Sequence, residues 1–303
     1  MKKILFLSLA VGSLFLSPAI SLFAGIIFAL TLGSEFDKYT SKASSLLLKI
    51  AVVGLGFGMN LIDSLQSSSE GILLTVFSVV LVMCGGVLLS KYLGIERKLG
   101  YLISSGTAIC GGSAIAAIAP IIKPNSNEIS MSLAVVFTLN AVAMLIFPPI
   151  GELLQLTQQQ FGMWSAIAIH DTSAVVGAAQ TYGEQALQIA TTVKLSRALW
   201  IIPLSIVSTL IFKSKEQKSK ISIPWFILLF IIAMTINTYF PINESVSNVI
   251  KLASHKMLSL TLFFIGSTLS ITTIRNAGFK PILLGIMLWV AISVVSLFVI
   301  LTF

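Results

Sequence analysis

The stretch ICGGSAIAAIA, from Ile109 to Ala119, interrupts an apolar segment with two adjacent glycines and a serine. A second stretch, IHDTSAVVGAA from Ile169, aligns with it, so that Cys110-Gly111-Gly112-Ser113 stands against His170-Asp171-Thr172-Ser173. Glycine weakens a helix, and serine, threonine and aspartate bond to freed backbone groups, so both segments are predicted to be discontinuous helices. Irregular backbone at membrane depth is tolerated where it lines an enclosed cavity, which makes that cavity the candidate solute site.

The composition around these stretches is that of a membrane protein. The chain has 303 residues, of which 56% are hydrophobic and 10% charged, and its mean hydropathy is +1.00; soluble domains carry about 25% charged residues. At roughly 20 residues per span, this length accommodates about ten or eleven transmembrane helices and no soluble catalytic domain. The net charge of +8 does not indicate nucleic acid, because the 19 lysines and arginines lie mostly in short loops between apolar segments.

Eleven apolar segments predict an all-α polytopic membrane protein, with residues 1–303 forming a single integral membrane transporter domain. The opening MKKILFLSLAVGSLFLSPA also fits a cleaved secretory signal, an alternative that leaves the orientation of the other segments unchanged. The segments lie at about 4–17, 19–33, 43–59, 71–90, 99–122, 129–150, 160–182, 186–212, 224–240, 256–274 and 281–302.

Basic residues in alternate loops predict a cytoplasmic N-terminus in the inner membrane of a bacterium. Lys251 and Lys256 are the main exceptions, since they are predicted outside. The residues that carry the argument follow the second, fourth, eighth and tenth segments: Lys38, Lys42, Lys91, Arg97, Lys98, Lys213, Lys215, Lys218, Lys220, Arg275 and Lys280.

Two features bear on how the segments are connected. The corner from Leu55 (LGFGMNLIDSLQSSSEGILL) resembles the corner from Ile265 (IGSTLSITTIRNAGFKPILL), and the first turns outside and the second inside. This predicts an inverted repeat, as in many secondary transporters, with generic likeness of helix corners as the alternative. The charge distribution also allows both interrupted segments, 99–122 and 160–182, to be re-entrant hairpins, because that topology keeps every strongly basic loop inside.

Ionisable residues lie deep in the interrupted segment 160–182. His170 and Asp171 are near its middle, where a charge costs on the order of 2.5 to 3.5 kcal/mol on insertion scales. A structural hydrogen-bonded knot is the alternative to a functional role for the pair. Because histidine titrates near neutrality and the carboxylate is held in low dielectric, both are predicted to couple protons.

Two cations share one face of the following segment. Lys194 and Arg197 are three residues apart. The mostly apolar run Ala198–Phe212 that follows rises roughly 22 Å, so both cations lie within the bilayer. They are predicted to face Asp171 or an anion, with snorkelling to the headgroups as the alternative. Asn140, inside another apolar segment, is predicted to bond across helices.

Three stretches carry a family resemblance over nearly the whole chain: Ser105–Lys123, Ser165–Ala179 and Thr191–Leu204. They resemble the YeiH family of bacterial membrane proteins, often labelled sulfate exporters, and the third to sixth segments also look like the bile-acid sodium symporter group. The resemblance implies a cation-antiporter-like fold, with a panel domain and a core domain in which two broken helices cross. Because the two interrupted segments run in the same direction in our count, Gly266-Ser267-Thr268 is an alternative crossing partner for the first of them.

These observations predict a secondary transporter, and no enzyme, for a small inorganic or organic anion such as sulfate or a sulfonate. Two histidines are too few for a zinc site and no P-loop is present, so no metal, cofactor or ATP-driven step is expected. The residues predicted to bind the anion are Thr107, Cys110, Gly111, Gly112, Ser113, Thr172, Ser173, Lys194 and Arg197.

The expected partners are that anion, a proton or sodium ion as the coupling ion, and the lipid bilayer. A homodimer is left open and nucleic acid is excluded. Two alternatives to anion transport remain: cation exchange with Asp171 as the carrier, and a membrane-embedded structural or binding subunit.

Overall fold

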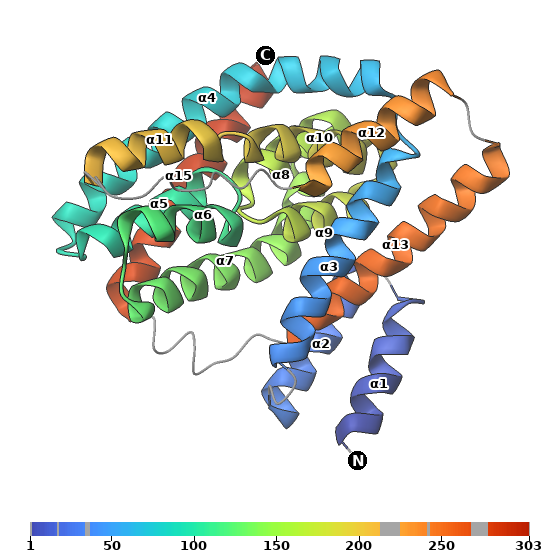
Figure 1. The fold of residues 1–303 in the computed structure, drawn as a ribbon, viewed down its shortest axis with the longest axis horizontal. Coiled ribbons are helices and arrows are strands. Elements are labelled where there is room, and N and C mark those ends of the chain that lie inside the picture. The colour runs from blue at the N-terminus through green and yellow to red at the C-terminus, as the bar shows by residue number, and fades with distance from the viewer. Residues whose placement is uncertain are drawn as a thin grey trace.

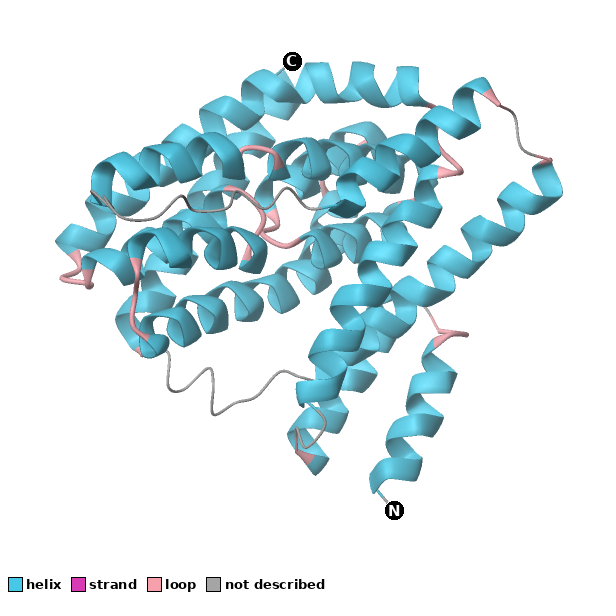
Figure 2. Ribbon diagram, viewed as in Figure 1, coloured by secondary structure: helices cyan, strands magenta, loops and turns pink. Residues whose placement is uncertain are grey.

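The computed structural model describes residues 2–16, 18–33, 37–212, 225–240, 243–267 and 278–302. Within these ranges the chain is helical apart from short turns, as Figure 2 shows, which confirms the predicted all-α class. Four kinds of predicted feature lie outside the described residues: Thr268, Arg275, the middle of the second corner from Ile265, and the basic loop with Lys213, Lys215, Lys218 and Lys220.

The described helices follow one another along the chain with few connecting residues (Figure 1). They are α1 (Lys2–Ser13), α2 (Pro18–Leu32), α3 (Asp37–Gly56), α4 (Leu61–Tyr92), α5 (Arg97–Ala108), α6 (Gly112–Ile122), α7 (Ser126–Leu153), α8 (Gln158–Ala168), α9 (Thr172–Tyr182), α10 (Glu184–Ala198), α11 (Ile201–Phe212), α12 (Trp225–Tyr239), α13 (Glu244–Ser267) and α15 (Phe279–Thr302).

Five stretches of the described residues are long and apolar enough to cross a membrane. Shorter apolar helices of the same kind lie at Ile20–Ala29, Leu46–Gly56, Gly112–Ile122 and Trp225–Tyr239. The long stretches are Leu74–Tyr92, Asn127–Leu153, Glu184–Phe212, Ser245–Ser267 and Phe279–Thr302.

The helices form two groups. In the first, here called the panel, α13 packs along both α2 and α3, with α1 against α13 and α12 against α3. In the second, the core, α10 packs on α8 and α9, α7 lies against α5 and α9, α4 packs on α5 and α10, and α15 packs on α8 and α5. The panel touches the core where α2 and α13 meet α9 and where α12 meets α4. The panel and core of the cation-antiporter kind that the family resemblance implies stay a prediction.

Glycine allows the two main panel helices to touch backbone to backbone. A Cβ atom at Gly266 of α13 would overlap the carbonyl oxygen of Leu22 and lie 3.0 Å from the amide nitrogen of Ile26. A Cβ atom at Gly25 of α2 would in turn overlap the carbonyl oxygen of Phe263. Close backbone approach through small residues is a common way for helices to associate in membranes. Gly266 therefore packs on α2, while Thr268 of the alternative crossing partner lies outside the described residues.

Replacing Gly266 with alanine should destabilise the panel. The added methyl group has only backbone atoms to displace, so we expect the free energy of unfolding to fall by about 2 kcal/mol or more. Thermal unfolding of the detergent-solubilised protein would measure this as a lower Tm. The control is Gly85→Ala in α4, whose Cβ would meet nothing within 4 Å. Equal Tm values for Gly266→Ala and Gly85→Ala would contradict the close packing.

Candidate functional site

The segment 99–122 is interrupted and turns back on itself. Helix α5 ends at Ala108 and α6 begins at Gly112, with Gly111 between them at φ 64°. Lys98, at the start of α5, donates from Nζ to the carbonyl oxygen of Lys123, just past the end of α6, at 2.6 Å. Both ends of the segment therefore lie together, and the segment is a hairpin whose tip is the predicted interruption.

The segment 160–182 forms a second hairpin. Helix α8 ends at Ala168 and α9 begins at Thr172. The rings of Phe161 and Tyr182, from opposite ends of the segment, stack with their centroids 3.8 Å apart. The backbone amide of Gln185 also donates to Oε1 of Gln158 at 3.0 Å. This hairpin is likewise closed at its base, with the His170-Asp171 interruption at its tip.

The two hairpins enter the core from opposite ends. They are joined by α7, which contains the candidate span Asn127–Leu153 and runs from the base of the first hairpin to the base of the second (Figure 1). Arms of 11 or 12 residues rise about 17 Å, close to half of a hydrocarbon core of about 30 Å. The expectation of eleven spanning segments with crossing broken helices is therefore wrong for these two segments. Both segments are hairpins, which is the shape that the re-entrant alternative expects.

The hairpin tips meet next to α7. A Cβ atom at Gly111 would lie 3.3 Å from Cβ of Asp171 and 3.2 Å from the side chain of Val136 in α7. The backbone amide of Asp171 donates to Oδ1 of Asn140 at 3.0 Å, which confirms the predicted cross-helix bond of Asn140. The two interruptions and the middle of α7 thus form one contact region, here called the tip junction.

Both cations of α10 are completely buried, so the snorkelling alternative is wrong. Lys194 and Arg197 have no exposed surface. The Lys194 ammonium donates to the carbonyl oxygens of Ile169 at 2.6 Å and Ala166 at 3.2 Å, at the end of α8. The last carbonyl groups of a helix carry partial negative charge, which a cation stabilises. Lys194 therefore neutralises the inner end of α8.

Arg197 connects the two hairpins. Its Nε donates to the carbonyl oxygen of Ala108 at 2.8 Å, and its Nη1 donates to the carbonyl oxygen of Ile167. These carbonyls belong to the inner ends of α5 and α8, so one guanidinium serves both helix ends. No ion pair with Asp171 occurs among the interactions of the described residues. The assignment of both cations as anion contacts stays a prediction.

The four helix ends at the tip junction are unequally compensated. The inner ends of α5 and α8 have the two cations. The N-terminus of α9 is capped by Asp171, whose Oδ2 accepts from the amide of Ser173 at 3.1 Å and from the Ser173 hydroxyl. The N-terminus of α6 follows Gly111 and has no side-chain cap. Of the four helix ends, the N-terminus of α6 is therefore the end whose partial charge is not balanced by a charged side chain.

Buried polar atoms without partners gather on the same elements. Among the described residues, Nδ2 of Asn140, Nη2 of Arg197 and both ring nitrogens of His170 are buried and make no hydrogen bond. An unpaired buried donor costs about 1 to 3 kcal/mol, so a ligand that accepts from it gains that much. The sequence analysis singled out Asn140 for a cross-helix bond but did not include it among the residues of the solute site.

The remaining predicted site residues divide by exposure. Gly112 is partly exposed, and Ser113, the next residue of α6, is exposed. The buried members are Thr107, Cys110, Thr172 and Ser173. Their roles in anion binding stay predictions, and Ser113 points away from the buried part of the junction.

Known proteins match almost the whole chain. Residues 5–285 match the family described as Conserved hypothetical protein 698. The chain is 52% identical over 288 residues to a UPF0324 membrane protein of Bacteroides thetaiotaomicron, an alignment that covers 94% of this chain and 86% of the relative. It is 48% identical over 288 residues to a UPF0324 membrane protein of Porphyromonas gingivalis, covering 93% and 86%. No solved structure matches the chain.

Proposed function

The chain belongs to the UPF0324 family of bacterial membrane proteins, also described as Conserved hypothetical protein 698, and on this premise we propose that it is a secondary transporter of a small oxyanion. The observation that carries the proposal is the N-terminus of α6, which lacks a side-chain cap at a junction where Asn140 holds an unpaired amide donor. Sulfate or a sulfonate is the substrate class, in line with the sulfate-exporter label of the resembled YeiH family.

The hairpin architecture supports transport. Two hairpins that enter from opposite ends and meet at their tips leave a thin barrier between the two sides of a membrane. Separation of either hairpin from α7 would open the junction to one side, which is the essence of alternating access. The division into panel and core gives two bodies that can move relative to each other around that junction.

The charge at the tip junction supports an anion as the solute. Lys194 and Arg197 contribute two positive charges and Asp171 contributes one negative charge, so the formal balance is positive by one. Backbone amides at a helix N-terminus and guanidinium groups both suit oxyanions. Because Nη2 of Arg197 has no partner, the side chain keeps one donor for a solute while its other nitrogens hold the helix ends.

Replacing Asn140 with aspartate tests the proposal with an almost isosteric change. The Oδ1 acceptor for the amide of Asp171 is retained, while the unpaired amide donor becomes a carboxylate oxygen that repels an anion. In proteoliposomes exchanging radiolabelled sulfate, we expect KM to rise at least about tenfold, equivalent to about 1.4 kcal/mol. The control is Asn127→Asp, the same change at an exposed position near the start of α7.

Two results would count against anion transport at this site. A wild-type KM in Asn140→Asp would contradict an anion site at the junction. Failure of the wild-type protein to move sulfate, methanesulfonate and every other oxyanion tested, while it copurifies with a partner protein, would favour a structural subunit.

Cation exchange is the second candidate, and the position of Asp171 at a hairpin tip favours it. There the carboxylate would carry a proton or sodium ion, with Lys194 competing for its charge. Sodium- or proton-driven exchange in the absence of any anion, undiminished by Asn140→Asp, would establish this alternative.

A further inference from the structure

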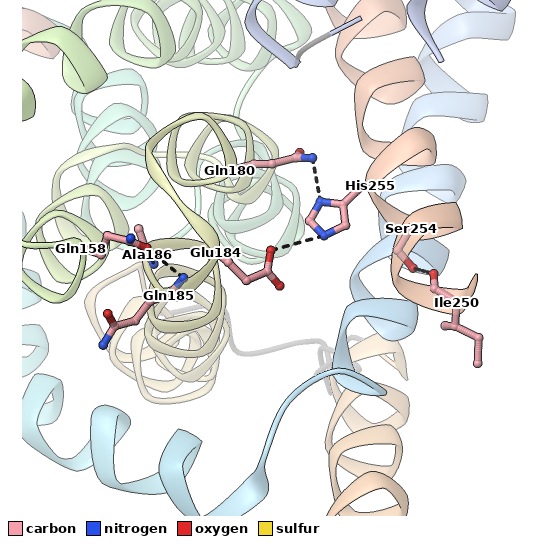
Figure 3. A network of polar contacts seen from close by, with 8 residues as sticks. All are labelled: Gln158, Gln180, Glu184, Gln185, Ala186, Ile250, Ser254 and His255. Atoms are coloured by element: carbon pink, nitrogen blue, oxygen red, sulfur yellow. Dashed lines mark hydrogen bonds and ion pairs between the residues drawn. The ribbon is translucent and has the colours of Figure 1, made fainter. Parts of the chain in front are cut away.

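A polar network joins the panel to the core at His255. The ring lies near the middle of the candidate span Ser245–Ser267 of α13. Its Nδ1 is 2.7 Å from Nε2 of Gln180 in α9, and its Nε2 is 3.6 Å from Oε2 of Glu184 at the start of α10. Figure 3 shows the ring between these two side chains, which reach toward it from the core. One titratable ring therefore connects the two bodies whose relative motion the proposed function requires.

A small pocket between the two groups borders the network at Glu184. Glu184, Gln188 and Thr191 of α10 line the pocket together with Lys251 of α13. The side chain of His255 is 23% exposed and that of Glu184 is 54% exposed. Thr191, which also lines the pocket, is completely buried, and its hydroxyl has no partner within the described ranges. Thr191 is less than one turn from Lys194 along α10.

The network can accommodate both protonation states of the ring. With a neutral ring, Nδ1 accepts from the Gln180 amide and Nε2–H points at the Glu184 carboxylate. With a protonated ring, Nδ1–H needs an acceptor, and Oε1 of Gln180 is buried and unpaired. Rotation of that amide by half a turn supplies the acceptor, since the two ends of an amide exchange donor and acceptor roles. Protonation of the His255 ring also creates an ion pair with Glu184, which joins the panel to the core.

His170 is less suited to carry a proton. It is 1% exposed and lies close enough to Lys194 and Arg197 to experience their charges. An imidazolium there would add a third positive charge to a buried cluster, with no carboxylate bonded to its ring among the described contacts.

We propose that His255 is the proton-binding site that couples transport to a pH gradient. This inference rests on the proposed function and replaces His170 and Asp171 as the coupling pair. The protonated ring attracts Glu184 and holds α13 of the panel against the core. Loss of the proton removes the ion pair and frees the two groups to separate, so the proton and the solute are bound in linked steps.

Few other charged groups act on the ring. On α13 itself, Lys251 lies one turn away and Lys256 is directed at the ring of Phe15. The neighbouring α2 has no ionisable side chain and α9 has only Tyr182. Helix α3 approaches His255 through Gly54, which packs on the adjacent residue Ser254. The ionisable residue of α3 nearest to Gly54 in the sequence is Lys49, which lies more than one helical turn before it. On α1, the lysines are confined to its first two residues.

The test compares two modes of sulfate movement in the same proteoliposomes. Wild-type protein should accumulate radiolabelled sulfate under an imposed pH gradient, with the membrane potential clamped, and should also exchange sulfate for sulfate without a gradient. For His255→Asn we expect the ratio of gradient-driven accumulation to exchange to fall at least about tenfold, in the usual range of coupling between sites. The control Lys256→Gln removes a charge from the adjacent residue and should keep the wild-type ratio.

A wild-type ratio in His255→Asn would overturn the inference. Equal loss of accumulation and exchange, in protein that elutes as folded from size exclusion, would also overturn it, because a purely structural role would lower both. Glu184→Gln supplies a second variant: its ratio should fall in the same direction, since it removes the carboxylate that the protonated ring attracts. If wild-type protein moves no oxyanion in either mode, the proposed function fails instead.

Discussion

Replacing Arg197 with alanine should leave little folded protein. The change removes the donors for the Ala108 and Ile167 carbonyl groups and opens a cavity where two hairpins meet. A buried carbonyl group left without a donor costs about 1 to 3 kcal/mol, and two such groups together with the cavity remove a large part of the stability of a typical domain. We expect a much lower Tm and, in the surviving fraction, loss of sulfate exchange, because the inner ends of α5 and α8 separate.

Arg197→Lys separates charge from geometry. The ammonium keeps the positive charge but lacks the planar fork that reaches one carbonyl on each hairpin, so its Tm should lie between those of the alanine variant and the wild type. The control is Arg97→Ala, because Arg97 is exposed at the start of α5 and stacks on Phe212 with its guanidinium carbon 4.8 Å from the ring centroid. That loss should cost less than about 1 kcal/mol. Similar Tm values for Arg197→Ala and Arg97→Ala would show that the carbonyl groups at the inner ends of α5 and α8 do not need a cation for stability.

Replacing Gly111 with valine should abolish transport. The backbone there has φ 64°, a conformation that costs an L-residue roughly 1 to 2 kcal/mol and that a β-branched residue rarely adopts. The side chain would also press on Asp171 and Val136 and push the hairpin tips apart. A displacement of about 1 Å can reduce a site's activity about a hundredfold, so we expect sulfate exchange to fall at least that far.

Gly94→Val is the control for Gly111→Val. Gly94 has φ 65° in the turn before α5, and a Cβ there would approach only the ammonium of Lys280, at 3.7 Å. It carries the same backbone strain without the contact between tips, so it should lower the Tm while exchange per folded molecule is retained. Equal loss of exchange in both variants would show that strain alone, and not the tip junction, explains the effect.

The positions of the interruptions were predictable because they follow from local chemistry. Gly111-Gly112 and His170-Asp171 are poor helix formers inside apolar segments, and the breaks lie there. The burial of Lys194 and Arg197 was also predictable, because two cations on one face of an apolar run usually face other helices rather than lipid. Their partners were not predictable, because the backbone carbonyls that they bind exist as acceptors only where the inner helix ends converge.

The sequence could not distinguish hairpins from spans. Each arm is apolar, and two arms in series have the length of one spanning helix, so hydropathy is the same in both topologies. The loop charges are also compatible with both, since only the positions of Lys123 and Glu152 differ. The His255 network had no signal either, because its members lie on three helices and are unremarkable one by one.

The sequence by itself determined the membrane class, the all-helical composition, the two interruptions and the burial of two cations, because these depend on hydrophobicity and backbone propensity within single segments. The tertiary structure alone decided that both interrupted segments turn back, that Gly111 meets Asp171, and that one helix end at the junction lacks a side-chain cap. These properties depend on distances between segments far apart in the chain, and packing, which no local pattern encodes, sets those distances.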